Sequence, residues 1–434
     1  MRVTILTVGS RGDVQPLVAF GAGLRDAGHE VRLATHPRYA PLVARHGLEF
    51  APLAEGHVSR GLETEQGRRW IEKGSGRLPA AVGFIRDARS VARQRLSDAV
   101  RACEHADAVV AFNLAIVLGW QVAELLGIPL VRATNEPPAC VLAPRAAHLV
   151  PLAWQTGWFA ARPWLNAVRR DAIGAGPLPI REPLAELNRR GEPVLLAFSA
   201  DVLPPPPGLG NSFEVTGYWL LDGTDDPPPS PALVDFLAAG PPPVAIGFGT
   251  MIETDPAASV RLVSDALARA GRRGVLVGRA ESPDDVELPP HLCAIKRIDH
   301  NWLFARCSAA VHHAAVGTIA TTLRAGIPMV AVPHMTHQFY WARRVNELGL
   351  GPPPIRRRRL TAERLAEAIQ IATTDEQMRH RAAALGERIR SEDGVARAVA
   401  AFERRVPRPL HRRPSAATPL PRSHHAQNHA HSGR

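Results

Sequence analysis

Lysine is almost absent from this chain of 434 residues, although the chain is strongly basic. Only Lys73 and Lys296 are lysines among the 52 cationic residues, and the formal net charge is +11. The arginines are spread along the sequence, with one tight run at Arg356–Arg359, and no basic stretch is interleaved with aromatic residues. Nucleic-acid binders concentrate their positive charge on one face or segment. The charge therefore reflects general arginine, alanine and proline enrichment, and we expect no nucleic-acid partner.

Cysteine and long hydrophobic runs are also scarce. The four cysteines show no C-x-x-C spacing and no histidine at metal-site spacing, which predicts buried thiols in a reducing compartment. No uncharged stretch reaches the ~18 apolar residues of a membrane span. The N-terminal MRVTILTVG has no cleavage site, so it predicts a first strand and not a signal peptide. We expect a soluble, cytoplasmic protein.

The first half alternates short apolar runs with amphipathic segments. A strand at Val3–Val8 leads through a glycine turn to a helix expected from Val14 to about Ala27. Later strands are expected at Val31–Ala34, Leu48–Leu53, Ala108–Phe112, Pro129–Ala133, Val194–Ser199 and Phe213–Gly217. This alternation of strands and helices predicts an α/β fold with a doubly wound parallel sheet. Because the first turn is not G-x-G-x-x-G and no acidic residue ends the next strand, nicotinamide binding is disfavoured.

An apolar segment from Ala147 to Val168 contains three tryptophans, of which Trp154 and Trp158 are the candidates for function. Packing of a helix into the core is the simpler interpretation. The alternatives are an apolar acceptor cleft or a flap in peripheral contact with a membrane, since clustered indoles bind apolar ring systems well.

Proline marks the domain boundary. Two proline triplets, Pro227–Pro229 and Pro241–Pro243, flank a short helix and predict a semi-rigid linker. The βαβ pattern then restarts at Val244. The predicted organisation is a first Rossmann-like domain (1–220), the linker (221–243), a second Rossmann-like domain (244–390), a C-terminal helix (391–405) and a disordered tail (406–434). Two doubly wound domains place a cleft between the carboxyl ends of their strands.

The stretch from His312 to Gln338 has the features of an anion site. A short strand, a turn that carries His313 and a helix that opens at Thr318 follow one another, and a polar loop ends at His337-Gln338. The free N–H groups of a helix start, beside a histidine, bind diphosphate well. We interpret the stretch as a nucleotide-sugar site.

Short motifs occur along most of the chain. They are SRGDVQP at 10–16, GFGTM at 247–251, HNWLF at 300–304, HHAAVGT at 312–318, LRAGIPMVAVP at 323–333 and EDGVARAVAAFERR at 392–405. In this order they resemble the GT-B-fold glycosyltransferases of family 1, in the subgroup of sterol glucosyltransferases and actinobacterial glycopeptide-antibiotic glycosyltransferases. The resemblance spans about residues 1–405. It implies two Rossmann-like domains that face each other across a cleft, with the acceptor on the first, the nucleotide sugar on the second, and the C-terminal helix returning to the first.

The resemblance also implies a reaction. A sugar moves with inversion from a UDP- or TDP-sugar to a hydroxyl of an apolar natural product or lipid, without a metal or another cofactor. Asp13 matches the family's general base, which removes the acceptor proton as the oxygen attacks the anomeric carbon. Asp13 also stands where a residue would cap the helix from Val14, and the two roles are compatible.

The other site residues that the resemblance implies lie around the donor. Diphosphate contacts are expected from Ser10, Arg11, Gly12, Thr250, His313, Gly317 and Thr318. The nucleotide base is expected beside Ile298 and Trp302, and the hydroxyls of the donor sugar beside His337 and Gln338. The alternative for His313 is a buried core histidine.

The donor stretch departs from the family pattern. Ala314, Ala315 and Val316 stand where relatives typically have Gly-Gly-Ala, and His337 replaces the acidic residue before Gln338. The usual carboxylate acceptor for sugar hydroxyls is therefore missing. These changes predict either an unusual donor, such as a deoxy sugar, or weakened donor binding. A non-catalytic relative that acts as a binding or auxiliary protein is the main alternative, and a nucleotide-sugar epimerase is another.

Overall fold

The computed structural model describes residues 1–56, 78–137, 150–205, 209–223, 226–248, 256–278, 288–334 and 336–407. The predicted phosphate contact Thr250 lies outside these residues, as does the predicted tail from residue 408 onward.

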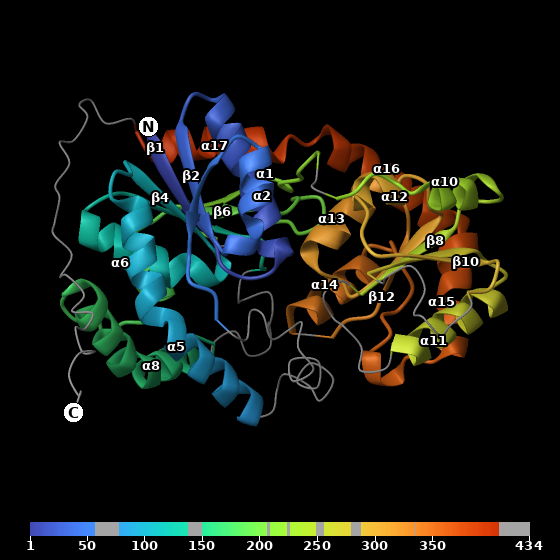
Figure 1. The fold of residues 1–434 in the computed structure, drawn as a ribbon, viewed down its shortest axis with the longest axis horizontal. Helices are drawn as coiled ribbons and strands as arrows, with labels where there is room; N and C mark the ends of the chain where they lie inside the picture. The colour runs from blue at the N-terminus through green and yellow to red at the C-terminus, as the bar shows by residue number, and fades with distance from the viewer. Residues whose placement is uncertain are drawn as a thin grey trace, which may run out of the picture.

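Two parallel sheets organise the described chain (Figure 1). The first has seven strands in the order β3-β2-β1-β4-β5-β6-β7, and the second has five in the order β10-β9-β8-β11-β12. The strands of the first sheet are β1 (Arg2–Leu6), β2 (Glu30–Thr35), β3 (Glu49–Pro52), β4 (Ala108–Phe112), β5 (Leu130–Thr134), β6 (Val194–Leu196) and β7 (Phe213–Val215). Those of the second are β8 (Val244–Gly247), β9 (Gly274–Val277), β10 (Leu292–Ile295), β11 (Ala309–His312) and β12 (Met329–Ala331). The predicted pair of doubly wound α/β domains is confirmed.

Helices cover both faces of each sheet. The helices of the first half are α1 (Arg11–Asp26), α2 (Ala40–Arg45), α5 (Leu78–Cys103), α6 (Ile116–Leu126), α8 (Val150–Ile173) and α9 (Pro183–Arg189). Those of the second half are α10 (Pro231–Ala238), α11 (Pro256–Arg269), α12 (His300–Phe304), α13 (Val316–Ala325), α14 (Thr336–Glu347), α15 (Ala362–Thr374), α16 (Glu376–Ser391) and α17 (Gly394–Arg405). Short 3₁₀ turns lie at η1 (Pro37–Tyr39), η2 (Asn113–Ala115) and η4 (Arg357–Arg359). Among these elements, α16 is one that the sequence analysis did not predict, because its charged residues and Gly386 obscure the apolar face.

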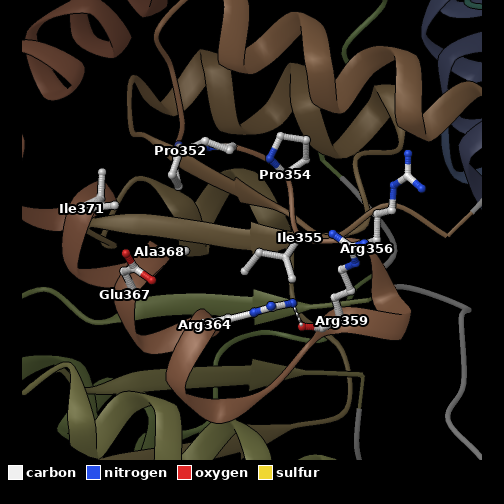
Figure 2. A pocket seen from close by; sticks show the side chains of 10 residues that line it. Pro352, Pro354, Ile355, Arg356, Arg359, Arg364, Glu367, Ala368 and Ile371 are labelled. Atoms are coloured by element: carbon white, nitrogen blue, oxygen red, sulfur yellow. Dashed lines mark hydrogen bonds between the residues drawn. The ribbon is translucent and has the colours of Figure 1, made fainter.

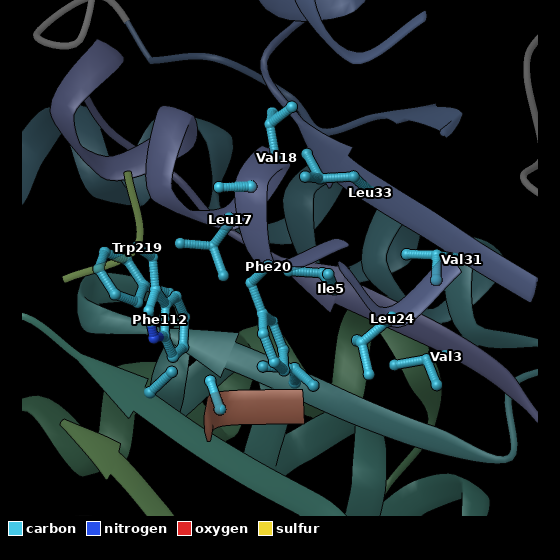
Figure 3. Close-up of a cluster of buried hydrophobic side chains, with 14 of the residues drawn as sticks. Val3, Ile5, Leu17, Val18, Phe20, Leu24, Val31, Leu33, Phe112 and Trp219 are labelled. Atoms are coloured by element: carbon cyan, nitrogen blue, oxygen red, sulfur yellow. The ribbon is translucent and has the colours of Figure 1, made fainter. Parts of the chain in front are cut away.

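The core of the first domain includes residues from the far end of the chain. Phe20 of α1 stacks on Trp219, with ring centroids 4.6 Å apart (Figure 3), and meets Phe402 of α17 edge-on at 6.4 Å. Helix α17 therefore packs against the first domain although it follows the second. Val406, predicted as the start of the disordered tail, is only 2% exposed because it extends this apolar contact.

The two domains share an apolar interface. Phe198, just after β6, packs edge-on against Trp341 of α14, with ring centroids 5.9 Å apart. Both side chains are fully buried, in a cluster that also includes Ala314 and the buried face of α13. The domains are thus joined by packed side chains as well as by the linker.

Ion pairs fix the linker between the domains. Asp222 lies 2.6 Å from Arg324 of α13, and Asp226 lies 3.0 Å from both Arg11 of α1 and Arg297 beyond β10. One linker carboxylate therefore bridges the two domains beside the start of α1.

Within the described ranges, no helix combines the length and the apolar character that a membrane crossing requires.

Candidate active site

Asp13 lies in the first turn of α1, directly after β1. The helix begins at Arg11, three residues earlier than expected, because Ser10 takes the cap position. One carboxylate oxygen of Asp13, Oδ2, accepts hydrogen bonds from the Ser10 N–H at 2.9 Å and the Ser10 hydroxyl at 3.0 Å. Gly9 has φ +133°, and a Cβ there would lie 2.5 Å from the same oxygen. This turn therefore needs glycine so that the backbone can pass close to the carboxylate.

Two asparagines that the sequence analysis did not identify complete the surroundings of Asp13. Asn113 follows β4 and donates from Nδ2 to Asp13 Oδ1 at 3.2 Å and to Asn135 Oδ1 at 2.9 Å. Asn135 follows β5 and is 9% exposed. Asn113 has φ 46°, a left-handed conformation that asparagine tolerates better than most residues. Both could have been found by asking which polar residues follow a buried parallel strand.

Burial raises the pKa of Asp13 above its ordinary value of 3.8, while the hydrogen bonds from Asn113 and Ser10 and the charge of His337 act in the opposite direction. A general base benefits from a pKa closer to the working pH, because its proton affinity is then higher. The geometry holds the carboxylate in one orientation. Because Oδ2 already accepts two hydrogen bonds and Oδ1 accepts one, a lone pair for a further donor remains on Oδ1.

On the opposite side, α13 begins directly after the turn that follows β11. Its cap residue, Ala315, provides no side-chain acceptor for the first N–H groups. Gly317 is exposed and Thr318 is half-buried in this first turn. An uncapped helix start of this kind leaves N–H donors available to an anion.

His312 supports this turn from inside. Its Nδ1 accepts the N–H of Ala314 at 3.1 Å, and its Nε2 lies 3.3 Å from the hydroxyl of Thr322. That hydroxyl also lies 2.7 Å from the carbonyl of Thr318, to which it donates, so His312 carries its proton on Nε2. Burial lowers the pKa of His312 to about 3, so the ring stays neutral.

Ala314 shows how the chain keeps the turn without the family's glycine. Its φ is 62°, a left-handed conformation that costs a residue with a Cβ ~1–2 kcal/mol. The methyl group is fully buried in the interdomain apolar cluster. The methyl group that distinguishes Ala314 from the family's glycine therefore packs on the core side of the turn.

His313 is half-buried beside the start of α13, with Nδ1 buried and lacking a hydrogen-bond partner within the described residues. Burial, reinforced by neighbouring imidazoles that include His312 and His334, lowers the pKa of His313 to about 3. The ring is thus neutral without a ligand and donates through one N–H. An adjacent anion would favour the charged form and raise this pKa.

His337 and Gln338, expected at the end of a polar loop, lie in the first turn of α14, which begins at Thr336. Gln338 is 3% exposed, and its side-chain oxygen accepts the N–H of His334 at 2.8 Å, which shapes the loop. His337 is partly exposed and faces the first domain, where its Nδ1 lies 3.8 Å from Oε1 of Glu136. Its charge also influences Asp13 and His313. His337 is therefore near both the candidate base and the candidate phosphate site.

The remaining predicted residues have varied surroundings. Arg11, predicted at the diphosphate, pairs with Asp226 at 3.0 Å. Ile298 is 5% exposed in an apolar cluster, and Trp302 carries the guanidinium of Arg306 4.2 Å from its ring centroid. Gly12 is exposed beside Asp13.

The tryptophans of α8 divide between the core and the surface. Trp158 is 6% exposed and donates its indole N–H to the carbonyl of Pro179 at 3.1 Å. Trp154 is 47% exposed. Packing accounts for Trp158, and an acceptor contact stays a prediction for which Trp154 offers the accessible surface.

A pocket of about 360 Å³ lies in the second domain, beside α15 (Figure 2). Arg356, Arg359, Arg364 and Glu367 are among its walls, and Arg364 donates to the carbonyl of Arg359 at 3.2 Å. None of the residues predicted for the donor or the acceptor lines it. The described residues also contain no group of three or more histidine, cysteine or acidic side chains placed to hold a metal ion.

Comparisons with known proteins agree with this arrangement. Residues 3–139 match the Glycosyltransferase family 28 N-terminal domain, and residues 263–401 match the C-terminal domain of Erythromycin biosynthesis protein CIII-like proteins. The Sterol 3-beta-glucosyltransferase of Emericella nidulans is 34% identical over 434 residues, which cover 93% of this chain and 30% of that protein. The chain thus spans less than a third of the length of this curated relative.

Two solved structures share the fold. The calicheamicin glycosyltransferase CalG4 has a TM-score of 0.70 and 21% identity, covering 94% of this chain and 99% of that one. The glycosyltransferase VinC in complex with dTDP has a TM-score of 0.67 and 18% identity, with the same coverage. Together with the two domain matches and the two parallel sheets, these similarities show that the chain has the two-domain fold of the GT-B glycosyltransferases.

Proposed function

We propose that the protein is an inverting glycosyltransferase that transfers a sugar from a UDP- or TDP-sugar to a hydroxyl of an apolar acceptor. The observation that carries this proposal is the position of Asp13. Hydrogen bonds from Ser10 and Asn113 hold its carboxylate at the carboxyl ends of the strands of the first sheet. Helix α1, which carries Asp13, contacts α13 of the second domain. A base on one domain and an uncapped helix start on the other are the two groups that glycosyl transfer needs.

The chemistry follows from this placement. Asp13 accepts the proton of the acceptor hydroxyl while its oxygen attacks the anomeric carbon from the face opposite the leaving diphosphate, which inverts the configuration. The departing nucleoside diphosphate gains negative charge. The N–H groups of α13, the Thr318 hydroxyl and the His313 ring stabilise that charge electrostatically, so we propose that no divalent cation is required.

The acceptor class rests on the relatives. The curated relatives are named as sterol glucosyltransferases, and the structural neighbours are glycosyltransferases of natural products such as calicheamicin. A sterol is an apolar ring system, and we propose an acceptor of that chemical class. The dTDP complex of a neighbour supports a thymidine nucleotide as the leaving group.

A ligand panel tests the donor half of the proposal. We expect UDP or TDP, and their glucose conjugates, to raise the thermal unfolding midpoint, because a ligand at 100 times its dissociation constant adds ~2.7 kcal/mol of stability. The measurement is differential scanning fluorimetry with AMP as the control nucleotide. If neither UDP nor TDP nor their glucose conjugates shift the midpoint, the transferase proposal fails and a binding or auxiliary role is favoured.

The pH dependence tests the base. A protonated Asp13 cannot accept a proton, so kcat/KM should fall as the pH decreases through its raised pKa, and the midpoint of this acid limb should lie above 3.8. Asn113 is the hydrogen-bond donor that most strongly lowers this pKa. Asn113→Gly, which suits the left-handed backbone, should therefore move the acid limb to higher pH. A limb that moves to lower pH in this variant, measured by sugar transfer to a sterol, would remove Asp13 from the role.

A further inference from the structure

A carboxylate and an imidazole from different domains face each other beside the candidate base. Glu136 follows β5 of the first domain, and His337 lies in the first turn of α14 of the second. Oε1 of Glu136 is 3.8 Å from Nδ1 of His337, and the side chains are 37% and 33% exposed. Both therefore border a space that a ligand can enter.

The side chains of Glu136 and His337 are close to each other but do not form a hydrogen bond. A separation of 3.8 Å is longer than a hydrogen bond, which joins heavy atoms at ~2.7–3.2 Å. By contrast, the pair of Arg11 and the linker residue Asp226 closes to 3.0 Å. Within the described residues the carboxylate of Glu136 has no hydrogen-bond donor, so its oxygens are available to ligand hydroxyls.

Glu136 is also tied to the candidate base through its backbone neighbours. Asn113 donates to both Asp13 and Asn135, which directly precedes Glu136, and the N–H of Glu136 donates to the hydroxyl of Thr134 at 3.0 Å. Burial raises the pKa of Glu136, His337 lowers it and Asp13 raises it, so the three charges act on one another. The position of the Glu136 backbone is thus set by the same network that orients Asp13.

Glu136 and His337 lie near the place expected for the donor sugar. The anomeric carbon must lie between the base and the diphosphate site, so the sugar ring occupies the space between Asp13 and His313. His337 influences both of these residues, and Glu136 lies beside His337. The carboxylate that the donor stretch lacks, because His337 stands in its place, is therefore present on the opposite side of the same space.

We propose that Glu136 is a specificity-determining residue that binds hydroxyl groups of the donor sugar, and that His337 orients its carboxylate. This inference rests on the proposed function and names the sugar class. Because a carboxylate accepts hydrogen bonds from two adjacent hydroxyls, the preferred donor carries a hexose with two adjacent free hydroxyls, such as glucose, and not a sugar in which either of them is missing. Recognition of the sugar then depends on Glu136, whereas recognition of the nucleotide does not.

The experiment separates sugar binding from nucleotide binding. Dissociation constants of UDP, TDP, UDP-glucose and TDP-glucose are measured by calorimetry for the wild type and for Glu136→Gln and Glu136→Ala. We expect UDP and TDP to bind these variants within about twofold of the wild type, and the glucose conjugates to bind ~10- to 100-fold more weakly, as for lost hydrogen bonds to a charged group. Glu104→Gln, at an exposed position in the same domain, is the control.

A double variant that relocates the carboxylate provides a second test. Combining Glu136→Gln with His337→Asp moves the carboxylate to the other domain and should restore most of the affinity for the glucose conjugates. Equal weakening of nucleotide and nucleotide-sugar binding in Glu136→Gln would show a structural role and overturn the inference, as would unchanged binding of the conjugates. If the wild type binds no nucleotide at all, the proposed function itself fails, which is a distinct result.

Discussion

Replacing Asp13 with asparagine is expected to lower kcat by ~10²–10⁴-fold, the usual contribution of a general base. The amide has almost the same shape as the carboxylate and keeps one oxygen that can accept the Ser10 N–H, but it cannot remove a proton. Nucleotide affinity should change little, since His313, Thr318 and the N–H groups of α13 lie on the second domain and the substitution leaves Ser10, Arg11 and Gly12 in place. Steady-state kinetics with a sterol acceptor and calorimetry with UDP give these two quantities.

The fold should survive this change. A negative charge in the first turn of a helix stabilises it by ~0.3–1 kcal/mol. Burial opposes that gain, because it raises the pKa of Asp13. Asp26→Asn, at the exposed end of the same helix, is the matched control and should keep wild-type kcat. Wild-type turnover in Asp13→Asn would contradict the mechanism, and loss of folding would leave it to be tested by the pH profile of Asn113→Gly.

The predictable parts of the fold are those encoded locally. Strands such as Ala108–Phe112 are continuous apolar runs, which a strand buried on both faces requires, and their positions follow from composition alone. The C-terminal helix predicted at 391–405 corresponds to α17 at Gly394–Arg405, because its apolar residues recur at helical spacing. Helix α16 was not predicted because its apolar positions are separated by arginines and a glycine.

The candidate site was predictable only where a motif marks it. Asp13 and His313 lie in motifs that the family resemblance identifies, whereas Asn113, Asn135 and Glu136 follow strands in segments that carry no motif. Their proximity to Asp13 depends on the order of β1, β4 and β5 in the sheet, which brings residues about a hundred positions apart to one edge. The order of strands in a sheet cannot be read from local residue spacing. The sequence therefore predicts that the site lies at the carboxyl ends of the strands, but not which residues meet there.

The turn at Ala314 shows a second limit. The sequence indicates that glycine is missing, and steric reasoning then predicts either a shifted turn or a narrowed pocket. In the structure the backbone keeps the left-handed conformation, and His312 compensates by accepting the Ala314 N–H. Whether a methyl group points to the ligand or to the core depends on the tertiary packing around β11, which only the folded chain defines.

Removal of the Phe402 side chain is expected to cost ~3–5 kcal/mol of unfolding free energy, as for other buried phenylalanines replaced by alanine. Phe402 is fully buried, and its ring meets Phe20 at 6.4 Å and the ring of His29 at 5.7 Å. Truncation leaves a cavity between α17 and α1, which rigid parallel strands behind α1 cannot close. Urea unfolding at 25 °C, followed by circular dichroism, measures the change.

Phe339→Ala on α14 is the matched control, because this phenylalanine is 41% exposed. Its loss should change stability by no more than ~0.5 kcal/mol, as is usual for surface positions. The contrast between the two variants measures how strongly α17 is bound to the first domain. A cost below ~1 kcal/mol for Phe402→Ala would mean that the C-terminal helix contributes little to that core. A large cost means that a segment following the second domain stabilises the domain that carries Asp13, and so links the two halves of the candidate active site.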